Sequence, residues 1–265
     1  MNGESTLSGS TRAEWIKFRT VRSSTWGVFT TVVLMIGLGA LFAVLTRTHW
    51  TQLSPLRVAT FDPVSNSIGG ILLAQFAVGV IGAMFITSEF TSGSIRTTLT
   101  AVPNRARLLA SKMVVLLVTM LLVGEFVCFT AFLIGQRIYL GVVPTASLTN
   151  GTVLRSVVLA GIYLAFLTLI GFALGVIVRQ SAATISIYVG LLLIVPLIVF
   201  FLPQSWQNDI QRFEPSSLGA AMESPLAQSN SFGAWSATLV LLIYVVALLA
   251  VAFTLFQRRD AGANT

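Results

Sequence analysis

The chain has 265 residues, of which 55% are apolar and only 9% are charged, and its mean hydropathy is +0.87. An average soluble domain has about 25% charged residues, so this chain has too few polar side chains to coat a water-soluble globule. The composition excludes an ordinary soluble enzyme and predicts a membrane protein. The net charge of +7 indicates attraction to an anionic membrane leaflet, not to nucleic acid, because the basic residues flank apolar blocks.

Six apolar blocks are long enough to cross a bilayer, whose hydrocarbon core of about 30 Å needs about 20 helical residues. The predicted spans cover residues 26–46, 68–88, 113–135, 156–178, 182–202 and 235–256. None alternates with the period of two expected of barrel strands, and a helix satisfies its own backbone in lipid. We therefore predict an all-α, polytopic membrane protein with six transmembrane helices. Residues 12–265 form one transmembrane domain after a flexible N-terminus, 1–11.

The segment before the first span, EWIKFRTVR, repeats apolar residues every three positions between basic ones. The residues of this predicted interfacial amphipathic helix are Trp15, Lys17, Phe18, Arg19, Val21 and Arg22. Such a helix lies along the inner leaflet, although the same residues also suit a plain positive anchor. The apolar block that follows is longer than the core of a signal peptide and lacks an A-x-A site, so we expect it to be retained as a span.

The distribution of Lys and Arg predicts the orientation. If both termini are cytoplasmic, eleven of the sixteen basic residues lie on the inner side and five on the outer side. Positive charge is retained on the cytoplasmic side. The basic loop between the second and third spans is therefore also expected inside.

Within that loop, Ile95, Leu99 and Val102 recur at i, i+4 and i+7, which predicts a short helix over residues 94–101 that Pro103 ends. A helix this short is marginal by itself, because isolated helices below about 12 residues are unstable in water. Something must pack against it. The candidates are the membrane surface and a cytoplasmic partner with a groove for Ile95 and Leu99.

The sequence lacks the motifs of metal-dependent hydrolysis and of nucleotide binding. An H-E-x-x-H metal site needs two histidines, and the chain has only His49. A phosphate-binding loop ends in G-K-[ST], and neither Lys17 nor Lys112 follows a glycine. The single cysteine, Cys128, is interpreted as a small buried residue. We expect no metal, no cofactor and no catalytic activity in this chain.

Glu125 is the one acid inside a predicted span. An intramembrane acid is a candidate proton relay or substrate contact. The alternative is a neutral carboxylic acid that is hydrogen-bonded to a neighbouring helix. No second charge lies within a predicted span to complete a relay.

Four segments together resemble the permease subunits of ABC-2 type ATP-binding-cassette transporters, particularly the short six-span versions common in actinobacteria. They are AEWIKFRTVRSSTW, TSEFTSGSIRTTLTAVPNR, PSSLGAAM and FQRRDA. The second is the most specific, because Glu89, Phe90, Gly93, Ile95 and Arg96 match the family's E-[YF]-x-x-G-[ST]-I-R run.

The resemblance implies that the loop after the second span carries a coupling helix that docks on a separate ATPase subunit, which binds the ATP. It implies that Glu89 and Arg96 fix the loop, that Gly93 allows the turn, and that Ile95 and Leu99 grip the ATPase. It also implies short helices around residues 215–222 that dip back toward the membrane.

On this reading the chain is the membrane subunit of an exporter in the bacterial plasma membrane. It pairs with an identical or a second permease and moves a hydrophobic or amphipathic substrate. Two alternatives remain: a proton-coupled secondary transporter that uses Glu125, and a membrane scaffold that transports nothing.

Overall fold

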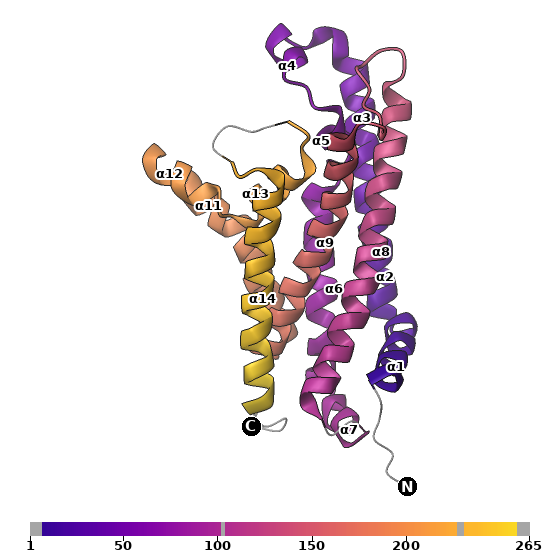
Figure 1. Ribbon diagram of the computed structural model, residues 1–265, viewed down its shortest axis with the longest axis vertical. Helices are drawn as coiled ribbons and strands as arrows, with labels where there is room; N and C mark the ends of the chain where they lie inside the picture. The colour runs from indigo at the N-terminus through magenta and orange to yellow at the C-terminus, as the bar shows by residue number, and fades with distance from the viewer. Residues whose placement is uncertain (1–6, 102–103, 227–230, 259–265) are drawn as a thin grey trace.

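The computed structural model describes residues 7–101, 104–226 and 231–258, and all regular structure within these ranges is helical (Figure 1). Six helices are long and apolar enough to cross a membrane, which confirms the predicted fold class. The first span consists of α2 (Arg22–Val32), a π-helical turn (Val33–Gly37) and α3 (Leu38–His49). The second, third and fourth are α6 (Ile71–Thr91), α8 (Arg105–Tyr139) and α9 (Gly151–Val178). The fifth consists of α10 (Ser181–Val189), a second π-helical turn (Gly190–Ile194) and α11 (Val195–Phe200), and the sixth is α14 (Ala234–Arg258).

Shorter helices lie between the spans. They are a 3₁₀ turn (Trp50–Gln52), α4 (Pro55–Ala59), α5 (Pro63–Ser67), α7 (Ser94–Ala101), α12 (Gln204–Gln211) and α13 (Pro215–Glu223). α1 (Leu7–Thr20) precedes the first span. Its start at Leu7 differs from the prediction of a flexible segment to residue 11, while residues 1–6 lie outside the described part of the chain.

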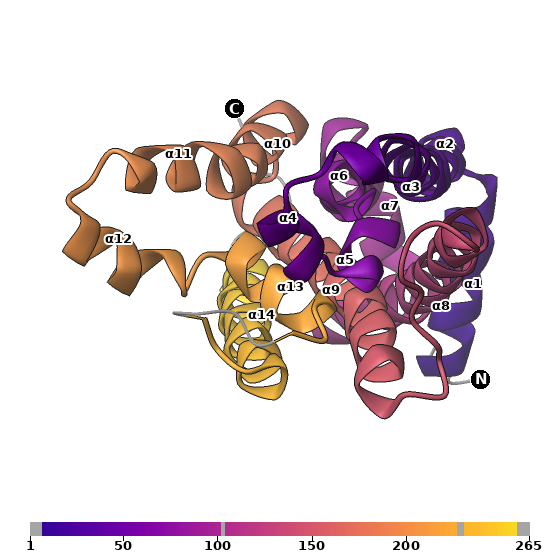
Figure 2. The ribbon, with the colours of Figure 1, turned by 90° about the horizontal axis from the view of Figure 1, so that it is seen from above.

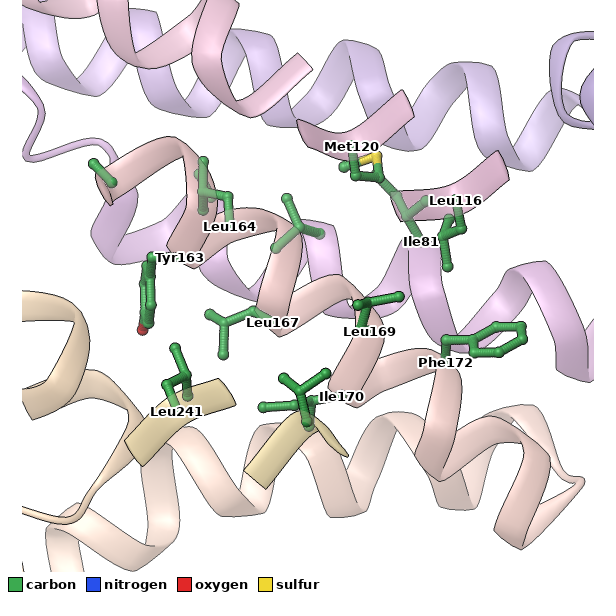
Figure 3. Close-up of a cluster of buried hydrophobic side chains, with 14 of the residues drawn as sticks. Ile81, Leu116, Met120, Tyr163, Leu164, Leu167, Leu169, Ile170, Phe172 and Leu241 are labelled. Atoms are coloured by element: carbon green, nitrogen blue, oxygen red, sulfur yellow. The ribbon is translucent and has the colours of Figure 1, made fainter. Parts of the chain in front are cut away.

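α9 is the central helix of the bundle, with α6, α8 and α14 packed around it (Figure 2). In its most apolar stretch 78% of the residues are buried, more than in any other span. The shared core joins α9 side chains to Ile81 of α6, Leu116 and Met120 of α8, and Leu241 of α14 (Figure 3). The backbones of α6 and α9 approach closely at Gly82, where an added Cβ would lie 2.9 Å from the Phe172 amide nitrogen.

α13 lies beside α9. In Figure 1 it is somewhat below the top of the bundle, which is the end opposite α7. Leu218 and Met222 are fully buried, and Gly219 faces the ring of Tyr163. Tyr163 is twelve residues beyond Gly151, the first residue of α9, or about 18 Å along that helix. A helix therefore forms at the position that the family resemblance implied. By contrast, α11 and α12 extend away from the bundle (Figures 1 and 2).

Candidate functional site at the α7 end of the bundle

The turn from α6 into α7 is built on Gly93. This residue has a φ of +70°, and no neighbouring atom lies near the position of a Cβ. The need for glycine is therefore conformational, because the left-handed region is costly for other residues. Gly93 lies in the turn that the family resemblance implied, and α7 begins at the next residue.

The apolar side of α7 faces its own chain. Ile95 is 1% exposed and belongs to the main hydrophobic core, and Leu99 packs against that core. In this structure the chain itself covers Ile95, and a grip of this residue on a partner stays a prediction. Thr97 and Thr100 are exposed, as is the turn at residues 91–93. The side chain of Arg96 lies outside the described part of the structure, and its role remains a prediction.

Four charged residues from three helices form ion pairs next to the pair of helices α6 and α7, which we call the α6–α7 hairpin. We call these residues the inner charge cluster: Glu14 and Lys17 of α1, Glu89 of α6, and Lys112 of α8. Lys112 has no solvent-exposed side-chain surface. Its Nζ donates to Glu14 Oε2 at 2.7 Å and to Glu89 Oε1 at 2.5 Å, and Lys17 Nζ also donates to Glu89 Oε1. Two lysines and two glutamates balance in charge, as a buried cluster requires.

Aromatic rings cover the cluster on one side. Lys112 Nζ lies 5.3 Å from the centroid of the Phe85 ring, and Phe18 packs edge-on against that ring at 5.5 Å. A cation over an aromatic face gains electrostatic stabilisation, which is larger away from water. The cluster thus links α1, α6 and α8, and its Glu14, Glu89 and Lys112 side chains are buried.

A second set of contacts joins the hairpin to the later spans. Phe90, at the end of α6, packs edge-on against Phe256 of α14 at 6.3 Å, and the Arg179 guanidinium lies 5.2 Å from the Phe90 ring. At the start of α8, Arg105 donates to the carbonyls of Phe256 and Gln257 at 3.5 and 3.4 Å. The residues that flank α7, Phe90 at the end of α6 and Arg105 at the start of α8, therefore contact the ends of the fourth and sixth spans.

The structure divides the predicted interfacial helix between two environments. Phe18 is buried and Lys17 turns into the inner charge cluster, so these residues bind the chain itself. Trp15 is 41% exposed, and Arg19 and Arg22 are also exposed. The Arg19 guanidinium lies 5.8 Å from the Trp15 ring. Contact of these three residues with lipid remains a prediction.

Sequence reasoning missed most of the cluster. It placed Lys17 on the interfacial helix and gave Lys112 no structural role, although both pair with glutamates from other elements. The available signal was the presence of Glu14 and Glu89 on a flank otherwise rich in basic residues. An acid in such a position indicates a paired lysine or arginine.

Glu125 lies where α8 crosses α9 at Gly161, whose added Cβ would be 2.6 Å from the Glu125 Cδ. Its Oε2 is buried and accepts no hydrogen bond from any described residue. The described residues give Oε2 no hydrogen bond to a neighbouring helix, and the choice between a relay and a neutral, hydrogen-bonded acid stays open. Whether Glu125 acts in transport stays a prediction.

Another acid with a shifted pKa lies outside the predicted spans. Burial raises the pKa of Glu223, at the end of α13, to about 8, and the negative charge of Asp62 adds to the effect. Asp62 Oδ2 accepts a hydrogen bond from Ser224 Oγ at 2.8 Å. The sequence analysis did not find Glu223, because this residue lies between the fifth and sixth predicted spans and only acids within a span were considered.

These features define a polytopic helical membrane protein with a short helix held between its second and third spans. The sequence profile described as ABC-2 family transporter protein matches residues 57–261, more than half of the chain. The chain therefore belongs to the ABC-2 transporter family. No curated protein matches it.

Proposed function

We propose that the chain is the permease subunit of an ABC-2 type exporter and that a separate cytoplasmic ATPase drives it through α7. The observation that carries the proposal is the arrangement of α7. Its apolar side is fixed to the chain through Ile95, while Thr97, Thr100 and the Gly93 turn are left exposed at one end of the bundle. A partner that binds this exposed side and moves α7 would therefore also move the transmembrane core, because α7 is packed against it.

The inner charge cluster would transmit a movement of α7 to the transmembrane helices. Glu89 lies two residues before the end of α6 and is held by Lys112 of α8 and Lys17 of α1. A displacement of the α6–α7 turn must therefore carry α1 and α8 with it or break buried ion pairs. Breaking a buried pair costs about 3–5 kcal/mol, so concerted movement is favoured.

The proposal also includes the orientation of the chain, its dimerisation and the class of substrate it exports. The excess of basic residues on the α7 side favours a cytoplasmic location for that end and for both termini. A path between two six-helix bundles favours a dimer, with an identical or a related permease chain. Family membership and the apolar spans favour export of a hydrophobic or amphipathic substrate.

The docking role of α7 can be tested by placing charge on its exposed side. We expect the double substitution Thr97→Glu and Thr100→Glu to lower the amount of ATPase subunit that co-purifies with the chain by about tenfold. Loss of one or two interface contacts of about 1.4 kcal/mol in total has this effect. The thermal stability of the chain should not change, because both side chains are exposed.

The matched control carries the same charges at the other end of the bundle, Thr51→Glu and Thr60→Glu, where both threonines are also exposed. This control should retain the ATPase. Equal co-purification by the two double variants would reject docking on α7.

A further inference from the structure

A groove at the end of the bundle opposite α7 is lined by two arginines from distant parts of the sequence. Arg47 of α3 and Arg137 of α8 lie with Leu133, Ile134 and Ile138 around a volume of about 420 Å³. The Arg47 guanidinium donates to the Ile138 carbonyl at 2.9 Å, across 91 positions of the sequence. This bond holds the guanidinium over one of the last carbonyls of α8, which lack partners within the helix.

The ends of the predicted spans place both arginines near the lipid headgroups. Arg47 follows directly on the first predicted apolar block, which ends at residue 46, and Arg137 lies two residues beyond the third block, which ends at 135. At 1.5 Å per residue each is within about 3 Å of the hydrocarbon boundary. The apolar walls continue down into the bilayer, where the Leu133 side chain is 52% exposed.

The charge of the groove is uncompensated. No acid is among its lining residues, and Arg137 makes no hydrogen bond or ion pair with any residue that the structure describes. Arg47 uses one of its five N–H donors on Ile138, so the others remain for a ligand. Basic residues are depleted in loops on the side opposite the cytoplasm. Two arginines in one groove on that side therefore indicate a specific role.

We propose that this groove binds the headgroup of an anionic phospholipid from the leaflet opposite α7. Guanidinium groups match phosphate oxygens in charge and geometry, and two of them favour a headgroup with net negative charge over a zwitterionic one. Leu133, Ile134 and Ile138 would contact the acyl chains. The volume lies within the range of about 300–1,000 Å³ typical of small-molecule sites. The proposal is independent of docking on α7.

The test measures the thermal stability of the full chain in neutral detergent while phosphatidylglycerol or phosphatidylcholine is added. We expect phosphatidylglycerol to stabilise the natural chain at lower concentration than phosphatidylcholine does. The half-maximal concentration of phosphatidylglycerol should rise about fivefold in Arg137→Gln and about thirtyfold in the double variant Arg47→Gln, Arg137→Gln. The variant Arg47→Lys, Arg137→Lys should fall between them, because it keeps the charge but loses the planar fork.

Arg57→Gln is the matched control, because Arg57 is exposed on α4 and does not line the groove. It should leave the lipid response unchanged. Arg137→Gln alone decides the question if the double variant fails to fold, because Arg137 is exposed and holds no structural bond. Equal stabilisation by the two lipids, an equal loss in Arg57→Gln, or equal stabilisation by water-soluble glycerol phosphate would each overturn the proposal.

Discussion

Replacing Lys112 with methionine is expected to lower the free energy of unfolding by about 3–5 kcal/mol. The substitution leaves the Glu14 and Glu89 carboxylates without the ammonium that binds both of them at 2.7 and 2.5 Å. Their side chains are only 5% and 4% exposed, so water does not replace the lost partner. Thermal unfolding of the purified chain, followed by its size-exclusion profile, measures the effect.

Two controls make this prediction specific to the buried pairing. Lys17→Met removes the same charge from a side chain that is 34% exposed, and it should cost far less, because solvent screens its pair. The triple variant Glu14→Gln, Glu89→Gln, Lys112→Met should regain much of the lost stability, since no buried charge remains unpaired. A Lys112→Met protein as stable as the natural chain would show that the cluster does not hold α1, α6 and α8 together.

Replacing Ile95 with aspartate is expected to abolish coupling between ATP hydrolysis and transport. Ile95 is 1% exposed in the main core, so a carboxylate there must either be buried unpaired or pull α7 away from the bundle. Packing of a buried isoleucine is worth about 2–5 kcal/mol. Its loss therefore lowers the equilibrium constant for packing of α7 against its own bundle more than tenfold. The readout is the stimulation of the ATPase subunit by the permease in reconstituted vesicles.

Ile95→Leu is the control for this experiment, because it keeps the volume and apolar character of the side chain and should cost less than about 1.5 kcal/mol. The ATPase subunit should still associate with the Ile95→Asp chain through the exposed threonines, but without stimulation. Normal stimulation by Ile95→Asp would remove the anchoring role assigned to this residue.

Local sequence signals were sufficient for the spans and for the position of α7. Long uncharged blocks predict spanning helices whatever their partners are, and the i, i+4 spacing of Ile95 and Leu99 predicts α7. The turn at Gly93 came from the family resemblance. The same signals did not show which way Ile95 points. An amphipathic helix of eight residues has an apolar side in either case, and only the tertiary structure decides whether its own chain or a partner covers that side.

The inner charge cluster could not be predicted from the sequence for a similar reason. Glu14 and Lys112 are 98 positions apart, and their pairing depends on how α1 lies against α8. Rules on flanking charge treat each lysine as a separate anchor in the headgroup layer. Glu125 was found from the sequence, but its lack of a hydrogen bond follows from its position against Gly161, where α9 offers only backbone.

The most direct test of the account is a photo-crosslinking residue placed at position 97, on the exposed side of α7, in living cells. We predict that irradiation joins the chain to a protein with a nucleotide-binding P-loop, and that the same residue at position 60 gives no such product. A product at position 60 instead, or modification of position 97 by a membrane-impermeant reagent added outside the cells, would contradict the claim that a cytoplasmic ATPase drives this permease through α7.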